Sequence, residues 1–201
     1  MKNMNLETAV KIVNERHQVS YGNWYEHSFY VARAAYTIAD MLKMDAEKAF
    51  VMGVMHDIGR SFSNGQFRHI RDGYEYLNNL GYPEIAKICL THSFVIQDIN
   101  TYVGKMDISD AERMKYQYIL SRQQYDDYDR LIQLCDSIST SNGYVIPEKK
   151  FVTNAFKYGF KETTIEKWRA ALELYKSFEE KLGMNVNLFV EQSVEKLMEL
   201  K

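Results

Sequence analysis

The scarcity of helix-breaking residues is the sequence feature that most constrains this chain. Only two prolines, Pro83 and Pro147, occur in 201 residues. Apolar residues recur at steps of three and four over long stretches, for example between Val31 and Leu42, and long alternating strand patterns are missing. The sequence therefore predicts an all-α protein.

Start and stop signals divide the chain into helices. Asn23 and Asp45 are expected N-caps, and Gly59 and Gly81 are expected helix stops. Pro83 is expected in the first turn of a helix. The predicted helices cover 5–18, 24–43, a segment from Asp45 to 57, 69–81, a segment from Pro83, 126–141, and two or three more after Pro147 that divide at Gly159 and Gly183. Residues 95–124 are predicted to be part loop and part helix.

Length and composition predict a single domain over 1–201, with a core at 20–145 and a helical extension at 147–201. The net charge of −2 gives no strong case for nucleic-acid binding. No apolar run approaches the roughly 20 residues that span a bilayer, and the N-terminus has no signal-peptide core. We therefore expect a cytoplasmic protein with no membrane partner. Cys89 and Cys135 sit in apolar runs and are expected to be reduced core residues.

Two aspartates stand where the pattern otherwise predicts core. Asp57 follows His56 at the end of an apolar segment, in the sequence GVMHDIGR at 53–60. Asp136 lies within LIQLCDSI, and no lysine or arginine stands three or four residues from it. A buried carboxylate needs a cation, a set of hydrogen-bond donors or a metal. A plainer alternative is that Asp136 hydrogen-bonds or caps a neighbouring helix.

The histidines strengthen the case for a metal. His17 lies in a polar stretch and is expected to be structural, whereas four others lie at or near apolar helix faces. Each of the four alone would more often be a hydrogen-bonded core histidine than a ligand. Together with carboxylates, imidazoles suit Mn, Fe, Co, Ni or Zn, and the missing thiolates argue against a structural zinc. The four histidines are His27, His56, His69 and His92.

The order of these residues resembles the HD-domain superfamily of metal-dependent phosphohydrolases, over residues 23–140. HSFYVARAA resembles the first-histidine helix of that family, and VMHDIGR resembles its histidine–aspartate doublet. FRHIRDGYEYL, CLTHS and LIQLCDSI resemble the segments of the third histidine, the fourth histidine and the terminal aspartate.

The resemblance implies an HD-type helical bundle, here with additional C-terminal helices, and a set of metal ligands. His27, His56, Asp57 and Asp136 correspond to the ligands of one ion. In a two-metal subset, His69 and His92 would hold a second ion and Asp57 would bridge the two. That subset includes dinucleoside-tetraphosphate hydrolases and HD-GYP cyclic-dinucleotide phosphodiesterases, and the missing GYP part argues against the latter. The expected cofactors are one or two divalent ions of Fe, Mn, Ni, Co or Zn.

The resulting hypothesis is an enzyme that hydrolyses a nucleotide or another small phosphate ester or anhydride through a metal-activated hydroxide. Its expected partner is the phosphorylated substrate, and the sequence leaves a homodimer open. Two alternatives stay open as well. One is a one-metal nucleoside-monophosphate phosphatase, and the other is a non-catalytic metal-dependent nucleotide sensor.

Several further residues are candidates for contacts with the substrate. Asp57 and Arg60 are the predicted catalytic residues. Arg60 could clamp a phosphate, or it could be a solvated arginine just past a helix end. Arg68 is a weaker candidate for a phosphate contact, and Tyr25 could stack on a base or belong to the core. The segment 95–124 could be a lid or a packing element, and the C-terminal helices read as a brace or a dimer surface.

Overall fold

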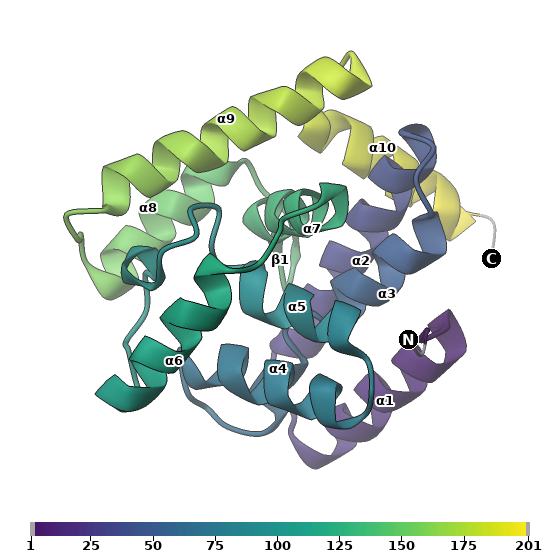
Figure 1. Cartoon of the computed structure of the whole chain (residues 1–201). Coiled ribbons are helices and arrows are strands. Elements are labelled where there is room, and N and C mark those ends of the chain that lie inside the picture. Colours follow the sequence, from purple (N-terminus) through teal and green to yellow (C-terminus); the bar gives the residue numbers. More distant parts are fainter. Residues whose placement is uncertain (1–2, 200–201) are drawn as a thin grey trace.

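The computed structural model describes residues 3–199, with side chains described for 3–193. Helices dominate this part of the chain, which confirms the all-α prediction (Figure 1). The α-helices are α1 (Leu6–Val19), α2 (Trp24–Met41), α3 (Ala46–Met55), α4 (Arg68–Asn79), α5 (Pro83–Thr91), α6 (Asp110–Ser121), α7 (Asp127–Ile138), α8 (Pro147–Tyr158), α9 (Thr164–Leu182) and α10 (Val186–Glu199). Two 3₁₀ helices, η1 (Ile58–Ser61) and η2 (Ile99–Thr101), and two strands, β1 (Ser139–Thr140) and β2 (Gly143–Tyr144), complete the set.

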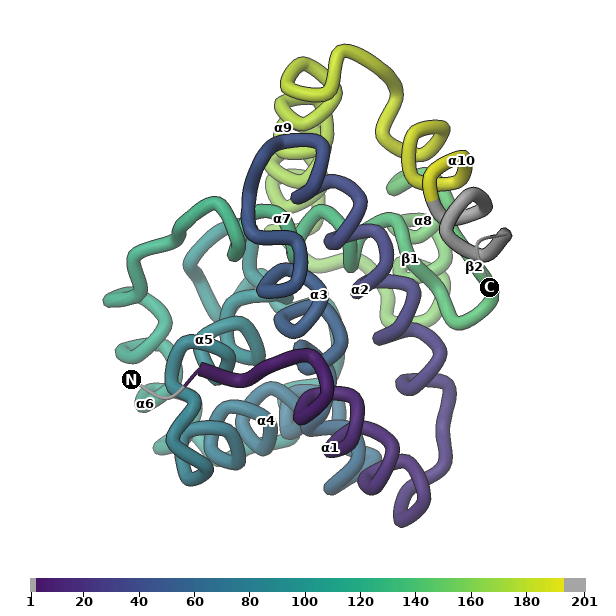
Figure 2. Tube along the Cα trace, turned by 90° about the vertical axis from the view of Figure 1, so that its right-hand side faces the viewer, coloured from purple at the N-terminus to yellow at the C-terminus, as the bar shows by residue number. Residues whose placement is uncertain are grey.

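The helices surround three apolar clusters. The largest cluster joins α2, α3 and α7 to α9 and α10, and it includes Ile38, Leu131 and Phe178. A second joins α1 to α3, α4 and α5, and a third lies beneath α6. Figures 1 and 2 show α9 and α10 at one end of the molecule and α1 with α4 at the other. Helices α2, α3, α5 and α7 run between these ends.

Small residues let α2 and α3 approach closely at the centre. A Cβ atom added at Gly53 would lie 2.7 Å from the Cα of Ala32, so only glycine fits on α3 at this contact. Ala32, Ala34, Ala35 and Ala39 of α2 are fully buried. Interiors are close-packed, so this contact fixes the spacing of two helices whose ends carry His27 and His56.

A glycine also controls the segment that follows the histidine–aspartate doublet. The prediction that Gly59 stops a helix running to 57 is wrong, because α3 already ends at Met55 and Gly59 lies within η1. A Cβ at this position would lie 1.8 Å from the carbonyl oxygen of His69. Glycine is needed here because the backbone of α4 passes directly over η1.

Most of the other predicted helix boundaries are confirmed, and one predicted N-cap makes no capping bond. Asp45 caps α3 by accepting from the Lys48 amide, and Gly81 (φ 83°) ends the helix before Pro83. Asn23 precedes α2 but makes no side-chain cap, because its backbone is already helical. Residues 95–124 are part loop and part helix, as predicted.

The end of α7 differs most from the prediction of a helix to 141. The helix ends at Ile138, and a two-residue hairpin follows in which Ser139 pairs with Tyr144. Polar turn formers at 139–143 favour such a turn over continued helix. The hairpin reverses the chain and leads into α8. As predicted, Gly159 and Gly183 divide the C-terminal segment into α8, α9 and α10.

Within the described residues, no helix has both the length and the apolar character needed to cross a membrane.

Candidate metal centre

The structure brings the six predicted ligand residues to one place from five segments. His27 lies in the first turn of α2, and the His56–Asp57 doublet forms the turn between α3 and η1. His69 lies in the first turn of α4, His92 directly follows α5, and Asp136 lies in the last turn of α7. Four of the six side chains, those of His56, Asp57, His69 and His92, are almost fully buried.

Asp57 lies at the centre of the cluster. Ligand atoms of His27, His56 and Asp57 lie within 4.8 Å of one another. Those of Asp57, His69 and His92 form a second group, whose atoms also lie within 4.8 Å of one another. Each group could hold a metal ion, and Asp57 belongs to both. A carboxylate has two oxygens and can therefore serve two cations.

Three of the imidazoles are held by the same backbone contact. The Nδ1 atom of His56 lies 2.7 Å from the carbonyl oxygen of Gly53, and that of His92 lies 2.9 Å from the oxygen of Cys89. Nδ1 of His69 bonds the carbonyl of Gln66 in the same way. A carbonyl can only accept, so each Nδ1 carries the proton. In the neutral ring, Nε2 then has no proton and carries a free lone pair. This is the tautomer in which Nε2 can bind a metal.

These lone pairs face a carboxylate, which also has no proton. Nε2 of His69 lies 3.2 Å and Nε2 of His92 lies 3.6 Å from Oδ1 of Asp57. Among the described residues, His56 Nε2 and Asp57 Oδ1 are buried without a hydrogen-bond partner. Unpartnered buried acceptors are costly, and a cation bound between these two atoms would compensate both. The residues present therefore fit divalent metal ions.

The electrostatics keep the cluster in its ligand form. Burial opposes ionisation of Asp57, but Arg60 and the nearby histidines hold the pKa of this carboxyl well below its usual range. Burial lowers the pKa of His92 to about 3, and burial together with Arg60 lowers the pKa of His69. At neutral pH the carboxylate is ionised, and these two imidazoles are neutral.

Asp136 lies at the edge of the cluster with two partners. Its Oδ1 lies 3.1 Å from Nε2 of His27 and 2.9 Å from Nζ of Lys150 on α8. Although burial raises the pKa of Asp136, Lys150 and His27 keep it well below its usual range. The carboxylate is outside both compact groups of donors but borders the one that contains His27. Its assignment as a ligand stays a prediction.

Arg60 is bound to the cluster rather than freely solvated, and its role as a phosphate clamp stays a prediction. Its Nε donates to Oδ2 of Asp57 at 2.5 Å, and its Nη2 lies 3.4 Å from Nε2 of His69. The side chain is 38% exposed, so it is not a freely solvated arginine. It neutralises one oxygen of Asp57 and leaves guanidinium donors at the edge of the cavity described below.

Buried polar contacts fix α5 against α7, and hence His92 against Asp136. The hydroxyl of Thr91 donates to Oδ1 of Asp129 at 2.7 Å, and Lys87 lies 2.6 Å from Oδ2 of the same carboxylate. Asp129 is completely buried. Asp129 could not be recognised from the sequence, because its neighbours Asp127 and Arg130 are charged and give no sign of burial.

The cluster lies at the bottom of a cavity of about 600 Å³. One wall comes from the helices that carry the ligands, together with Trp24, Arg60 and Tyr102. The opposite wall comes from α8 and α9, with Lys150, Lys157, Lys167, Phe151, Tyr158 and Trp168. Sequence reasoning assigned no chemistry to these C-terminal residues. No local pattern links them to the ligands, because the hairpin and the path of α8 bring them there.

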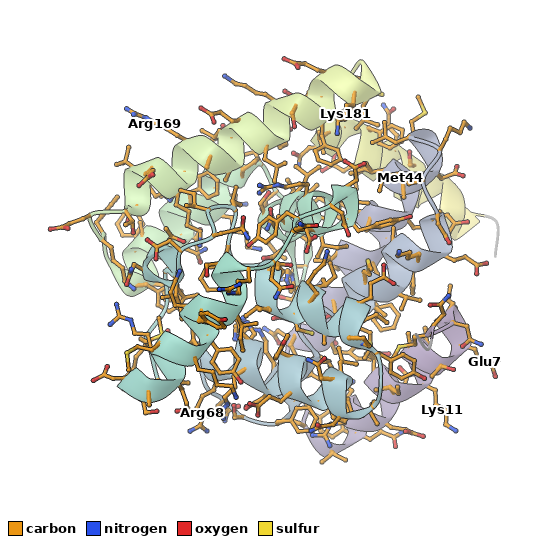
Figure 3. All side chains as sticks on the ribbon, viewed as in Figure 1. Glu7, Lys11, Met44, Arg68, Arg169 and Lys181 are labelled. Carbon is orange, nitrogen blue, oxygen red and sulfur yellow. The ribbon has the colours of Figure 1, made fainter. Side chains whose placement is uncertain are left out.

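Two predicted substrate contacts lie outside this cavity. Tyr25 stacks on His17 with ring centres 4.1 Å apart, and its hydroxyl donates to Asn14. Arg68 is exposed, and Figure 3 shows it at the margin of the molecule. Neither residue is among those that line the cavity.

The family of the chain follows from a match to a known domain. A model of the HD domain matches residues 24–141, more than half of the chain. The chain belongs to the HD-domain family. No curated protein and no solved structure matches it.

Membership in the HD-domain family agrees with the resemblance to metal-dependent phosphohydrolases. All six predicted ligands of this HD domain lie inside the matched region, from His27 to Asp136. Helices α8, α9 and α10 lie outside it. The family match therefore covers the predicted ligands, whose roles stay predictions, and the wall formed by α8 and α9 lies beyond the match.

Proposed function

We propose that this HD-domain protein is a phosphohydrolase with two divalent ions, acting on a nucleotide or another small phosphate ester or anhydride. The observation that supports two ions is the position of Asp57. Its carboxylate belongs to both compact groups of donors, and each group contains two histidines besides it. The first ion would be held by His27, His56 and Asp57, with Asp136 beside them, and the second by Asp57, His69 and His92.

The ions, when bound, would lower the pKa of a coordinated water from about 15.7 toward 7 and neutralise phosphate charge. The protein's share is to keep the donors in place and in the right protonation state. The carbonyls of Gly53, Gln66 and Cys89 hold the Nδ1 protons. The Nε2 atoms of His69 and His92 therefore stay directed at Asp57. Because the pKa of each of these two imidazoles is lowered, neither has to lose a proton on binding an ion.

Arg60 is suited to hold the phosphate. Its guanidinium bonds Asp57 through Nε and reaches the cavity, so its remaining N–H groups can donate to phosphate oxygens. Arginine binds phosphate with a planar set of donors, and it stays charged at any physiological pH. Asp57 sets the direction of this side chain, so the two predicted catalytic residues act as one unit.

Aromatic residues in the cavity support a substrate with a planar ring. Trp168 and Phe151 are stacked, with centres 5.5 Å apart and planes at 12°, and both line the cavity. Trp24, Tyr102 and Tyr158 line it as well. Stacking of a base on an aromatic side chain contributes about 1–3 kcal/mol, which favours a nucleotide over a phosphate ester without a ring.

The test combines metal counting with a hydrolysis screen. Protein loaded separately with Mn, Fe, Co, Ni and Zn is analysed for metal content and assayed against mono-, di- and polyphosphate nucleotides. We expect two ions per chain, and release of phosphate or of a nucleotide product. Asp57→Asn should lose both ions and turnover together, because its carboxylate serves both groups. Asp127→Asn, which removes a carboxylate that is 77% exposed on α7, is the matched control and should change neither.

Other outcomes of the same experiment favour the rival functions. One ion per chain with full turnover would support the one-metal phosphatase, in which His69 and His92 are not ligands. Metal and nucleotide binding with no product across the panel would support a sensor. An Asp57→Asn variant that kept both its ions and its activity would contradict the site itself.

A further inference from the structure

The charge of the cavity is opposite to that of the chain. The sequence has a net charge of −2. Among the described residues that line the cavity, the cations are Arg60, Lys150, Lys157 and Lys167, whereas the carboxylates are those of Asp57 and Asp136. Cations exceed carboxylates by two before any metal binds. A concave site with excess positive charge concentrates anions, and this excess comes from α8 and α9.

Lys167 is a half-buried cation with no ion-pair partner among the described residues. Its Nζ donates to the carbonyl oxygens of Ser93 at 3.0 Å and Thr101 at 3.2 Å. Burial lowers the pKa of Lys167, and within the described part of the chain the carboxylate that acts against this shift is that of Asp136, which does not pair with it. Ser93 directly follows His92, so the ammonium group is held next to the metal centre. Two carbonyls satisfy two of its three N–H donors and leave the positive charge uncompensated.

Lys150 is held on the same side of the cavity. Its Nζ contacts Oδ1 and the backbone carbonyl of Asp136, and it lies 3.1 Å from the carbonyl of Ser139. Lys150 and Lys167 come from different helices. Lys150 lowers the pKa of Asp136, and Asp136 in turn acts to raise that of Lys167 against the larger effect of burial, so one carboxylate interacts electrostatically with both lysines. Arg60 lies beside Asp57 instead, so the cationic side chains form two groups with the metal ligands between them.

We infer that Lys150 and Lys167 form a second anion subsite next to the metal centre, so that the preferred substrate carries two or more linked phosphates. The inference rests on the proposed function and makes its substrate class more specific. One phosphate would lie at the ions and Arg60. The next would lie against the two lysines and supply the anion that Lys167 lacks, while the aromatic wall leaves room for a base.

Binding of two inorganic probes to the metal-loaded protein tests this subsite. Inorganic phosphate fills one position, and inorganic pyrophosphate can fill both. Calorimetry should show wild type binding pyrophosphate at least about 10-fold more tightly than phosphate. Lys167→Gln should weaken pyrophosphate binding by about 10-fold or more, the loss expected for one charge-assisted hydrogen bond, and change phosphate binding by less than about 2-fold. Lys150→Gln should weaken pyrophosphate binding more than phosphate binding through the loss of its charge, because its three N–H donors already bond Asp136 and Ser139.

Two neighbouring cations supply matched controls. Lys149 is exposed next to Lys150, and Arg169 is exposed two residues after Lys167, on the outer face of α9 in Figure 3. Lys149→Gln and Arg169→Gln should bind both probes as wild type does. Lys167→Arg keeps the charge and should retain most of the preference for pyrophosphate. If Lys167→Gln does not fold, Lys150→Gln and Lys167→Arg carry the test.

The outcomes separate this inference from the proposed function. A metal-loaded, active wild type with equal affinity for the two probes would overturn the subsite and leave the phosphohydrolase intact. Equal loss of both probes in the lysine variants would also overturn it, because the lysines would then serve the first phosphate. A wild type that takes up no metal would overturn the proposed function. A pyrophosphate preference that the lysine variants remove from metal-free protein would still support the subsite.

Discussion

Replacing Gly59 by alanine tests whether the close contact between η1 and α4 positions the metal centre. The added Cβ would lie 1.8 Å from the carbonyl oxygen of His69 and 2.6 Å from the amide nitrogen of Gly73. Both are backbone atoms, so no side chain can rotate away. Because a carbon–oxygen contact is normally about 3.3–3.6 Å, α4 would have to retreat by roughly 1.5 Å.

The cost follows from overpacking of a rigid interior. An extra methyl group in a close-packed core costs about 1–3 kcal/mol, and a clash with backbone belongs at the upper end. Alanine also restricts the unfolded chain, which returns only about 0.4–1 kcal/mol. A net loss of about 2–3 kcal/mol corresponds to a fall in Tm of roughly 4–12 °C for a chain of this size.

Thermal unfolding of chelated protein, followed by circular dichroism, measures this loss directly. Metal analysis of the same variant reports on the site, because a displaced α4 carries His69 away from Asp57. Gly73→Ala is a milder change at the same contact, since its Cβ would lie 3.1 Å from Sγ of Cys89 and 3.2 Å from the amide nitrogen of Gly59, distances that shifts of a few tenths of an ångström relieve. A Gly59→Ala protein with wild-type Tm and full metal content would refute the argument that this contact sets the site.

Three further predictions concern charge and pH. For metal-free protein, the lowered pKa of His92 (about 3 against 6.5) means that the unfolded chain binds more protons between these values. Stability should therefore fall as pH drops from 7 to 5, by about 2 kcal/mol from this residue, and denaturant titrations of His92→Gln should lack that part. Lys87→Met should lower the free energy of unfolding by about 3 kcal/mol, because it removes the cation that pairs with the buried carboxylate of Asp129. Lys115→Met, which breaks an exposed ion pair with Glu75, should lower it by under about 1 kcal/mol in the same denaturant titration. Arg60→Gln should lower kcat/KM for a nucleotide substrate by about 10-fold or more in steady-state assays, whereas Arg169→Gln should not; unchanged kcat/KM would remove Arg60 from the phosphate site.

Local signals were sufficient for most of the helices, whereas the resemblance to the HD-domain superfamily supplied the grouping of the candidate ligands. Apolar spacing located the helices, and polar residues within apolar faces marked His56, Asp57 and Asp136. Residues at such positions must point inward, so a compact bundle brings them together. Helix boundaries were less accurate where tertiary contacts decide, as at Gly59, whose role depends on α4 rather than on its own sequence neighbours.

Contacts that arise from the path of the chain could not be predicted in this way. Lys150 reaches Asp136 because a hairpin reverses the chain, and Lys167 reaches Ser93 across 74 residues. Nothing in the spacing of these lysines distinguishes them from solvated ones. Aromatic side chains could not be assigned from the sequence either. Tyr25 packs in the apolar cluster around α1, whereas Trp168 lines the cavity.

The bonds from three Nδ1 atoms to backbone carbonyls have a consequence for how this protein would take up a metal ion. Each imidazole is held by a carbonyl three residues earlier in the chain, so its orientation depends on local backbone and not on a cation. Little side-chain freedom remains to be lost when an ion arrives. Folding and loading are therefore separable steps, and one apoprotein preparation can be charged with different ions and compared without refolding.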